Sequence, residues 1–255
     1  VVIPWNADAA TLAALLHGVN GVLFTGGGLN LTFASPYVQT ADAIFHYAVA
    51  ANTAGDFFPL HGTCMGMQLL SILAAANESV LALNAFDSEN ASWPLTLNTD
   101  DAYAGRLIGT APGDIVRILT TENVTENLHH DGVFAATYAD NAALNDFYLL
   151  VSTNADRRGA VFVSTLEARQ YPITATQWHA ERPAFEHKPG IGLTHSLDAV
   201  MAMQYVANFF VEDARRSGHA FPADGALFAN YSVYGFAPVV EEDIAWGYTA
   251  YAMQL

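Results

Sequence analysis

Short apolar runs alternate with amphipathic stretches over the first third of the chain. The apolar runs cover residues 1–4, 21–24 and 57–61, and each predicts a buried strand. Helical composition follows each of them, at residues 9–17, 35–52 and 64–76. Strands and helices in this alternating order predict a parallel sheet that is covered by helices on both faces.

The later part of the chain is less regular. Residues 80–150 hold only short apolar runs between Asn, Asp, Thr and Gly clusters. Further strands are predicted at residues 147–152, 160–165 and 173–178. A long helix is predicted from the N-cap Ser196 to Arg215, followed after Gly218 by an aromatic, turn-rich tail. No repeat or linker divides the chain, so residues 1–255 are predicted to form a single domain.

Composition and charge exclude several classes of partner. Of the 255 residues, 52% are hydrophobic and only 13% are charged, which favours large layers buried on both faces. Nine Lys and Arg against 25 Asp and Glu give a formal net charge of −16. Nucleic acids and anionic membranes require clustered cations, so neither is expected as a partner. No run is long and apolar enough to predict a membrane span.

The single cysteine, Cys64, lies in the strongest local motif of the chain. A predicted strand ends, a Gly-x-Cys-x-Gly turn follows at Gly62 and Gly66, and an apolar helix begins. This arrangement predicts a nucleophile elbow, in which the helix N-terminus favours the reactive thiolate and the Met65 N–H faces a developing oxyanion. An inert buried cysteine on a glycine-rich turn is the alternative interpretation.

A second motif supplies the base that a cysteine nucleophile requires. His179 directly follows a predicted strand, and Glu181 lies two residues further on. Residues two apart in an extended segment share a face, so the carboxylate can orient the imidazole. Alone, an exposed His-x-Glu is more often solvated surface. Combined with the cysteine elbow, it predicts a Cys64–His179–Glu181 catalytic triad.

A third motif is the glycine-rich loop of residues 26–28, which follows the predicted strand 21–24. Such a loop can present backbone N–H groups to an anion and could complete the oxyanion hole, although a plain turn is the alternative. It is no phosphate-binding P-loop, because no Lys lies nearby. His129 and His130 lie in an irregular segment, no zinc-type His spacing occurs, and we predict no metal and no cofactor.

Three segments together resemble the class I glutamine-amidotransferase-like hydrolases, and within them the gamma-glutamyl hydrolase family. They are residues 24–27, 62–66 and 177–181. Flanking stretches support the choice of family, at residues 56–59, 121–129, 164–167, 171–172 and 208–215. The resemblance covers nearly the whole chain. It implies a three-layer αβα sandwich with a mainly parallel, flavodoxin-like central sheet. Family members begin with one more strand, so the sheet is expected to lack its first strand here.

The resemblance also implies an activity and further site residues. The family cleaves gamma-glutamyl bonds, notably in folylpoly-gamma-glutamates. By resemblance, Gly27 and Met65 would supply oxyanion N–H groups, and Gly26, Gln68 and His129 would contact a small-molecule poly-gamma-glutamyl substrate. A homodimer is an expectation from the family.

Two departures from the family pattern leave alternatives open. Typical members have Glu where this chain has Gln68, and Gln is the usual amidotransferase residue; many members have Pro where this chain has Ala180. One alternative is therefore a glutaminase-type amidotransferase, or a hydrolase of small gamma-glutamyl amines. Another is a catalytically inactive glycoprotein that binds a ligand on a hydrolase scaffold.

Five N-x-[ST] sequons indicate a secretory route, provided that a leader peptide precedes this chain. They lie at Asn30, Asn77, Asn90, Asn123 and Asn230. We therefore expect a lysosomal, vacuolar or secreted glycoprotein. An acidic pH optimum is also expected, because protonating the nine histidines removes nine of the sixteen net negative charges that would repel an anionic substrate.

Overall fold

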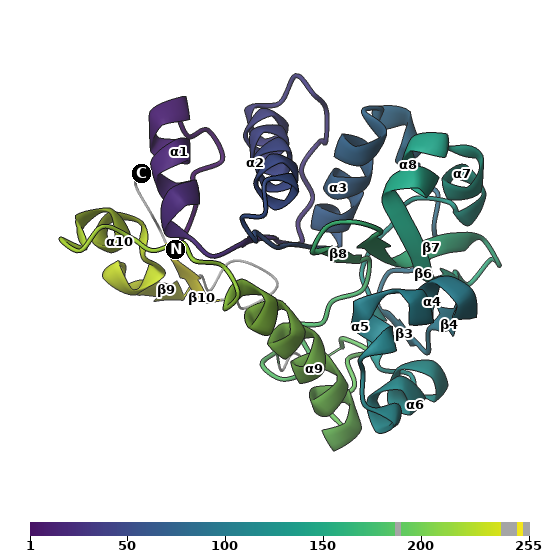
Figure 1. The fold of residues 1–255 in the computed structure, drawn as a ribbon. Coiled ribbons are helices and arrows are strands. Elements are labelled where there is room, and N and C mark those ends of the chain that lie inside the picture. Colours follow the sequence, from purple (N-terminus) through teal and green to yellow (C-terminus); the bar gives the residue numbers. More distant parts are fainter. Residues whose placement is uncertain (187–189, 241–248, 252–255) are drawn as a thin grey trace.

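A computed structural model describes residues 1–186, 190–240 and 249–251 (Figure 1). The strands are β1 (Val22–Phe24), β2 (Leu60–Thr63), β3 (Ala91–Trp93), β4 (Thr96–Leu97), β5 (Thr125–Asn127), β6 (Tyr148–Ala155), β7 (Val161–Ala168), β8 (Ile173–Thr176), β9 (Pro238–Val240) and β10 (Thr249–Tyr251). The helices are α1 (Ala9–Gly18), α2 (Pro36–Thr53), α3 (Met65–Ala75), α4 (Thr99–Ala104), α5 (Arg106–Gly109), α6 (Gly113–Thr121), α7 (Ala135–Asp140), α8 (Ala142–Phe147), α9 (Leu197–Ala214) and α10 (Ala226–Tyr231).

The central sheet of the described residues has the strand order β1-β2-β8-β7-β6-β4. The pairs β1–β2 and β2–β8 are parallel, whereas β8–β7, β7–β6 and β6–β4 are antiparallel. Strands β1, β2, β8 and β6 therefore run in one direction, and β7 and β4 run in the other. The parallel half matters for function, because Cys64 follows β2 and the segment that carries His179 follows β8.

Helices cover both faces of this sheet and make three layers. Figure 1 shows α1, α2, α3, α7 and α8 above the sheet, and α4, α5, α6 and α9 below it. The upper face buries one hydrophobic cluster, to which the apolar helix α3 contributes Met67, Leu69, Leu70 and Ile72. The lower face buries a second cluster, centred on Trp178 and the inner side of α9. The predicted αβα sandwich is confirmed.

Side chains at the helix N-termini explain where several helices begin. The Asp8 carboxylate accepts hydrogen bonds from the N–H groups of Ala10 and Thr11, both at 2.9 Å, and so caps α1. The Ser196 hydroxyl accepts a hydrogen bond from the Ala199 N–H at 3.1 Å and caps α9, as predicted. Pro36 occupies the first turn of α2, where its missing N–H leaves no hydrogen bond unmade.

Two of the strand predictions are corrected by the structure. Residues 1–4 form no strand; Val2 donates one backbone hydrogen bond, to the Tyr231 carbonyl, and Pro4 has no N–H to extend a ladder. The strand expected at residues 57–61 begins only at Leu60. The Asn52 amide oxygen accepts a hydrogen bond from the Phe58 N–H at 3.1 Å, and the Asn52 amide nitrogen donates one to the Phe58 carbonyl at 2.7 Å. Both backbone groups of Phe58 are therefore used outside the sheet.

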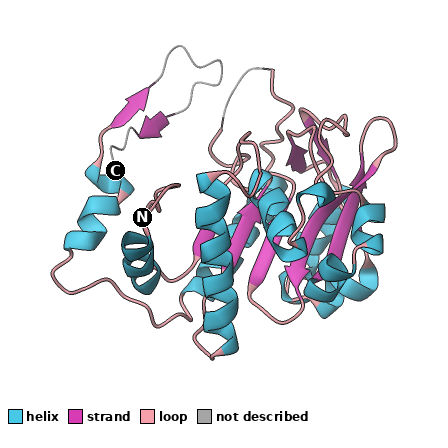
Figure 2. Cartoon of the chain, turned by 90° about the horizontal axis from the view of Figure 1, so that it is seen from above, coloured by secondary structure: helices cyan, strands magenta, loops and turns pink. Residues whose placement is uncertain are grey.

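The tail after α9 returns to the beginning of the chain. The Asn20 amide donates hydrogen bonds to the carbonyls of Ser217 and His219, at 3.2 and 2.8 Å. The His219 ring contacts the Leu16 carbonyl oxygen through Nδ1 and the Asp56 carboxylate through Nε2. Figure 2 shows α10 and strands β9 and β10 at the end of the molecule where the chain begins.

Candidate active site

Cys64 lies in a strained turn between β2 and α3. Its φ of 53° and ψ of −109° fall where residues other than glycine are rarely found. The turn is held on both sides. The Cys64 N–H donates to the Thr176 carbonyl at 2.7 Å, and a Cβ on Gly66 would lie only 2.2 Å from the Phe24 carbonyl oxygen. The Cys64 side chain is therefore held at the N-terminus of the 11-residue helix α3.

His179 and Glu181 lie on the segment that follows the neighbouring strand, β8. Nδ1 of His179 is 2.6 Å from Oε1 of Glu181. The imidazole is nearly buried, with 11% of its side chain exposed, whereas the carboxylate is half-exposed. A Cβ placed on Gly26 would lie 2.8 Å from Cε1 of His179 and 3.6 Å from Cβ of Cys64, so the imidazole and the elbow adjoin the same loop residue.

The electrostatics of this group favour a protonated imidazole. Burial alone would lower the pKa of His179, but hydrogen bonds to Cys64 and Glu181 and their negative charges outweigh it and raise that pKa to about 10. Burial would raise the pKa of Glu181, yet the hydrogen bond from His179 and its positive charge lower it. With Nδ1 bound to Glu181, Nε2 is the nitrogen that can exchange a proton with a substrate.

Two glutamine side chains lie behind the sulfur. The Gln177 amide N–H donates toward Sγ of Cys64 at 3.6 Å, and the Gln68 amide donates to Oε1 of Gln177 at 3.3 Å and to the Asp131 carbonyl at 2.9 Å. Both glutamines are buried. Sequence reasoning assigned no role to Gln177, although its position two residues before His179 in an extended segment was a usable signal.

The structure brings the glycine-rich loop against the elbow. A Cβ on Gly27 would lie 2.8 Å from Cε of Met65, and the Leu29 N–H lies 3.2 Å from the Met65 sulfur. The Met65 N–H is the first of α3 and has no acceptor within the helix. The oxyanion role of Gly27 and Met65 stays a prediction, and so does the substrate contact of Gly26, which lies between Cys64 and His179.

His129 and Gln68, the other two residues expected to contact the substrate, are buried in this structure. Nδ1 of His129 lies 2.8 Å from the Asp131 carbonyl oxygen, and Nε2 lies 3.2 Å from the Asn127 amide oxygen. Burial lowers the pKa of His129 to about 4, so the ring is neutral at pH 5 and above. Both side chains are occupied by protein partners, and their contact with substrate stays a prediction.

The asparagines of all five sequons are exposed in the structure (Asn30, Asn77, Asn90, Asn123 and Asn230). Asn30 lies two residues after the glycine-rich loop and next to Leu29, whose N–H contacts the Met65 sulfur. Within the described ranges, no group of three or more His, Cys, Asp or Glu side chains is placed to hold a metal ion. None of the helices in that part of the chain is long and apolar enough to cross a membrane.

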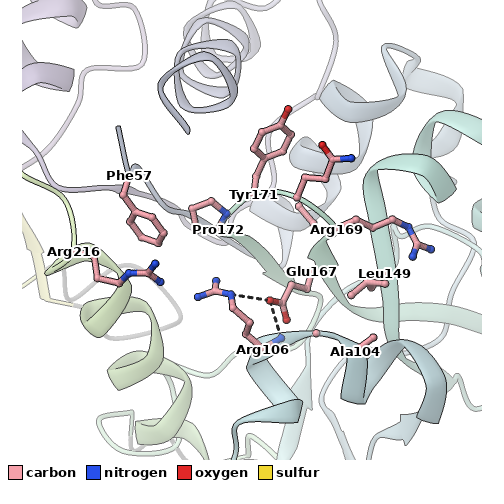
Figure 3. Close-up of a pocket in the computed structure, with 12 residues that line it drawn as sticks. Phe57, Ala104, Arg106, Leu149, Glu167, Arg169, Tyr171, Pro172 and Arg216 are labelled. Carbon is pink, nitrogen blue, oxygen red and sulfur yellow. Dashed lines mark hydrogen bonds and ion pairs between the residues drawn. The ribbon is translucent and has the colours of Figure 1, made fainter. Parts of the chain in front are cut away.

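A cavity of about 250 Å³ lies at the opposite edge of the sheet from Cys64 (Figure 3). Its lining includes Phe57 and Pro172, which precede β2 and β8, and the charged residues Arg106, Glu167 and Arg216, of which Arg216 stacks on the Phe57 ring at 3.8 Å. Arg106 and Glu167 are already paired within the protein. Arg106 binds the Asp213 carboxylate through both terminal nitrogens, at 2.9 and 2.7 Å. Glu167 accepts the Arg106 and Leu107 N–H groups at 3.0 and 2.9 Å.

A mixed sheet with helices on both faces and a strained cysteine turn after the interior strand β2 are the features of the class I glutamine-amidotransferase-like fold. A putative GMP synthase subunit from Thermoplasma acidophilum has a similar fold, with a TM-score of 0.50 at 16% identity, over 85% of this chain and 81% of that one. Residues 1–181 match the family described as peptidase C26.

Relatives of known name place the chain more closely. Gamma-glutamyl hydrolase B of Dictyostelium discoideum is 34% identical over 238 residues, which cover 93% of this chain and 67% of that protein. The gamma-glutamyl hydrolase of Rattus norvegicus is 34% identical over 254 residues, covering 98% and 77%. Gamma-glutamyl hydrolase 1 of Arabidopsis thaliana is 33% identical over 239 residues, covering 93% and 66%. The chain belongs to the peptidase C26 family, that of the gamma-glutamyl hydrolases.

Proposed function

We propose that this protein hydrolyses gamma-glutamyl bonds through a thioester on Cys64. The observation that carries the proposal is the strained elbow at Cys64, adjoined by an imidazole whose Nδ1 is 2.6 Å from the Glu181 carboxylate. A nucleophile, a base and a group that orients the base are the three parts that acyl transfer from an amide requires.

The first half of the reaction acylates the cysteine. The Cys64 thiolate attacks the gamma-carbonyl carbon, and the N–H groups of Met65 and Gly27 stabilise the resulting oxyanion. A well-placed donor of this kind lowers the barrier by about 3 kcal/mol. His179, held protonated by its neighbours, gives its proton to the leaving amine as the C–N bond breaks.

The second half regenerates the enzyme. His179, now neutral, takes a proton from water, and the hydroxide attacks the thioester carbonyl. The C–S bond breaks and the product leaves as a gamma-carboxylic acid, which releases its proton to the solvent and becomes a carboxylate. The other proton of the water stays on His179 and restores the imidazolium beside the thiolate. Glu181 keeps Nδ1 protonated throughout, so that Nε2 handles every proton transfer.

The substrates we expect are poly-gamma-glutamyl chains, including those of folylpolyglutamates. Its relatives' names support the gamma-glutamyl bond, and the sequence resemblance supports the polyglutamate. We further propose that the protein is a glycoprotein of a lysosome, a vacuole or the cell exterior, because the five sequon asparagines are exposed. A homodimer is the quaternary state to test first.

The experiment compares pteroyltri-gamma-glutamate with free glutamine as substrates, for the native protein and Cys64→Ala. We expect release of glutamate or glutamyl peptides from the first substrate, little from glutamine, and a loss of about 10³-fold or more in Cys64→Ala. Preferential hydrolysis of glutamine would instead support a glutaminase. Undiminished activity in Cys64→Ala would exclude the cysteine mechanism.

A labelling experiment separates an enzyme from an inactive scaffold. Iodoacetamide at pH 5 alkylates a thiolate that is paired with an imidazolium, whereas an ordinary cysteine thiol is almost unreactive there because little thiolate is present. We expect Cys64 to be labelled at pH 5. Absence of labelling in native protein, with full labelling after denaturation at pH 8, would favour the inactive ligand-binding alternative.

A further inference from the structure

One buried acid next to His179 has no part in the proposed reaction. Glu126, in the middle of β5, is completely buried, and within the described residues neither of its carboxylate oxygens has a hydrogen-bond partner. Its backbone carbonyl accepts the His179 N–H at 2.9 Å. A buried polar group without a partner is costly and uncommon in folded proteins, so its place beside the candidate base requires an explanation.

The arginine nearest to Glu126 is already engaged elsewhere. Nη1 of Arg182 lies 3.6 Å from Oε2 of Glu126, beyond hydrogen-bond distance. The same guanidinium binds both carboxylate oxygens of Glu186, with Nη2 at 2.7 Å from Oε1 and Nε bonded to Oε2. Both of these side chains are largely buried. Two carboxylates therefore face one guanidinium, and Glu186 makes the close contact.

The surroundings of Glu126 favour its neutral form. Burial raises the pKa of Glu126 to about 7, against the opposing positive charges of Arg182 and His179. The negative charges of Glu186 and Glu181 act in the same direction as burial. His195 flanks the segment, with Nδ1 at 2.9 Å from the Pro183 carbonyl oxygen. Below neutral pH a protonated Glu126 leaves the Arg182–Glu186 pair undisturbed.

We propose that Glu126 is a positioning residue that works as a neutral acid, and that its ionisation draws Arg182 from Glu186 and thereby loosens Glu181 from His179. Arg182 follows Glu181 directly in the chain, so a shift of the guanidinium is transmitted to the carboxylate that orients Nδ1. The inference rests on the proposed function. It adds that the alkaline limit of the activity is set by Glu126, which does not touch the substrate.

The test is the pH dependence of kcat on pteroyltri-gamma-glutamate for the native protein and Glu126→Gln, whose amide stays neutral. If only the neutral form is active, the native kcat falls about tenfold between pH 5 and pH 8. We expect Glu126→Gln to lack this fall, so that its ratio of kcat at pH 8 to kcat at pH 5 is about tenfold higher, with KM following the native profile. We call this fall of kcat with rising pH the alkaline limb of the profile. If the alkaline limbs of the native protein and Glu126→Gln coincide, the proposal is overturned.

A matched control and a second variant sharpen the test. Glu167→Gln replaces another buried glutamate, at the opposite edge of the sheet, and is expected to keep the native alkaline limb. Glu186→Gln removes the competing carboxylate and leaves Arg182 to Glu126, so Glu126 ionises more easily and the alkaline limb moves to lower pH. An unchanged limb in Glu186→Gln would contradict the proposal even if Glu126→Gln failed to fold.

Infrared spectroscopy tests Glu126 without any substrate. We expect the carbonyl band of a protonated carboxylic acid in native protein at pH 5.5, disappearing by pH 8.5, and missing from Glu126→Gln but present in Glu167→Gln. Absence of that band overturns the inference whether or not the protein hydrolyses gamma-glutamyl bonds. If the protein hydrolyses the substrate but the pH profiles of Glu126→Gln and Glu186→Gln match the native one, the inference is overturned and the proposed function stands. If the protein does not hydrolyse the substrate, the proposed function is overturned.

Discussion

At the scale of single residues, Gly26 sets how closely the glycine-rich loop approaches the base. A methyl group there would lie 2.8 Å from Cε1 of His179, and the ring would have to move away from Cys64. The fold itself would be little disturbed, because the obstacle is a side chain and not the backbone.

We therefore expect Gly26→Ala to lower kcat by about 100-fold, since small displacements of a catalytic group are this costly. Its melting temperature should stay within about 3 °C of the native value. Steady-state kinetics and a thermal melt make the check. Gly28→Ala is the control, because its methyl group meets nothing within 4 Å. Equal kinetics for the two variants would show that His179 is not confined by the loop.

Glu126 also makes stability depend on pH, independently of activity. Its folded-state pKa of about 7 lies above the ordinary value of 4.5, so the folded protein binds the proton more tightly than the unfolded chain does. This contribution to stability is largest in acid and is lost as the pH rises from about 4.5 to 7.

Glu126→Gln should remove this pH dependence. Between pH 5 and pH 8 the native protein should lose about 2 kcal/mol of unfolding free energy that the variant keeps. Urea denaturation at the two pH values measures the difference. The same substitution at the exposed Glu212 should leave the native dependence intact. The prediction fails if the native protein is equally stable at both pH values and Glu126→Gln has the same stability. Glu126 would then not be a neutral acid in the folded protein.

At the scale of elements, one acidic residue near the end of α9 joins that helix to α5. Asp213 binds Arg106 through two hydrogen bonds and Arg216 at 3.2 Å, and both of these arginines line the cavity of Figure 3. The Asp213 side chain is only 9% exposed, whereas the neighbouring pair of Glu212 and Arg215 is 68% exposed on both sides.

We expect Asp213→Asn to lower the unfolding free energy by about 2 kcal/mol, because the partly buried Arg106 loses its closest counter-charge and keeps only the longer contact with Glu167, at 3.5 Å. Glu212→Gln, one residue earlier, should cost less than about 0.5 kcal/mol, since exposed ion pairs contribute little. Denaturant midpoints for the two variants make the comparison. Equal losses would mean that the Arg106–Asp213 contact does not join the helices energetically.

The elements also show what sequence could and could not predict. The elbow is a local pattern, so Gly62, Cys64 and Gly66 were sufficient to place it between β2 and α3. The helices α4, α5, α7 and α8 have four to six residues and β3, β4 and β5 two or three, too few for a periodic pattern to stand out in residues 80–150. The fold class was predicted and is confirmed, and the middle of the chain was not assigned.

Contacts between distant segments account for the features that were missed. Nothing in the neighbourhood of Glu126 marks it as buried, because its environment is supplied by Arg182 and His179, more than fifty residues later. The start of β2 depends on the Asn52 side chain, which a strand pattern does not reveal. Sequence patterns report local preferences, and tertiary contacts of this kind override them.

At the scale of the whole molecule, the net charge of −16 opposes an anionic substrate. Acid reduces this repulsion, but less than nine histidines would suggest. Burial lowers the pKa values of His61 and His129 to about 4, so both rings stay neutral at pH 5.

We expect kcat/KM for pteroyltri-gamma-glutamate to be highest in mildly acidic solution. Added salt should raise kcat/KM more at pH 7 than at pH 5, because screening matters most where repulsion is strongest. Measurements at two salt concentrations and at fixed pH values test both expectations. A maximum above pH 8, or a salt effect that is larger in acid, would contradict the electrostatic argument.

The hydrogen bonds between Asn20 and the segment at residues 217–219 have a consequence for synthesis on the ribosome. Together with the bond from Val2 to the Tyr231 carbonyl, they give the first twenty residues partners that are translated some two hundred residues later. The hydrophobic layers, with Leu12 and Leu16 of α1, can collapse as the chain emerges, but these hydrogen bonds must wait. A ribosome stalled before residue 217 should therefore carry a nascent chain whose first twenty residues are more open to proteases than those of the released protein.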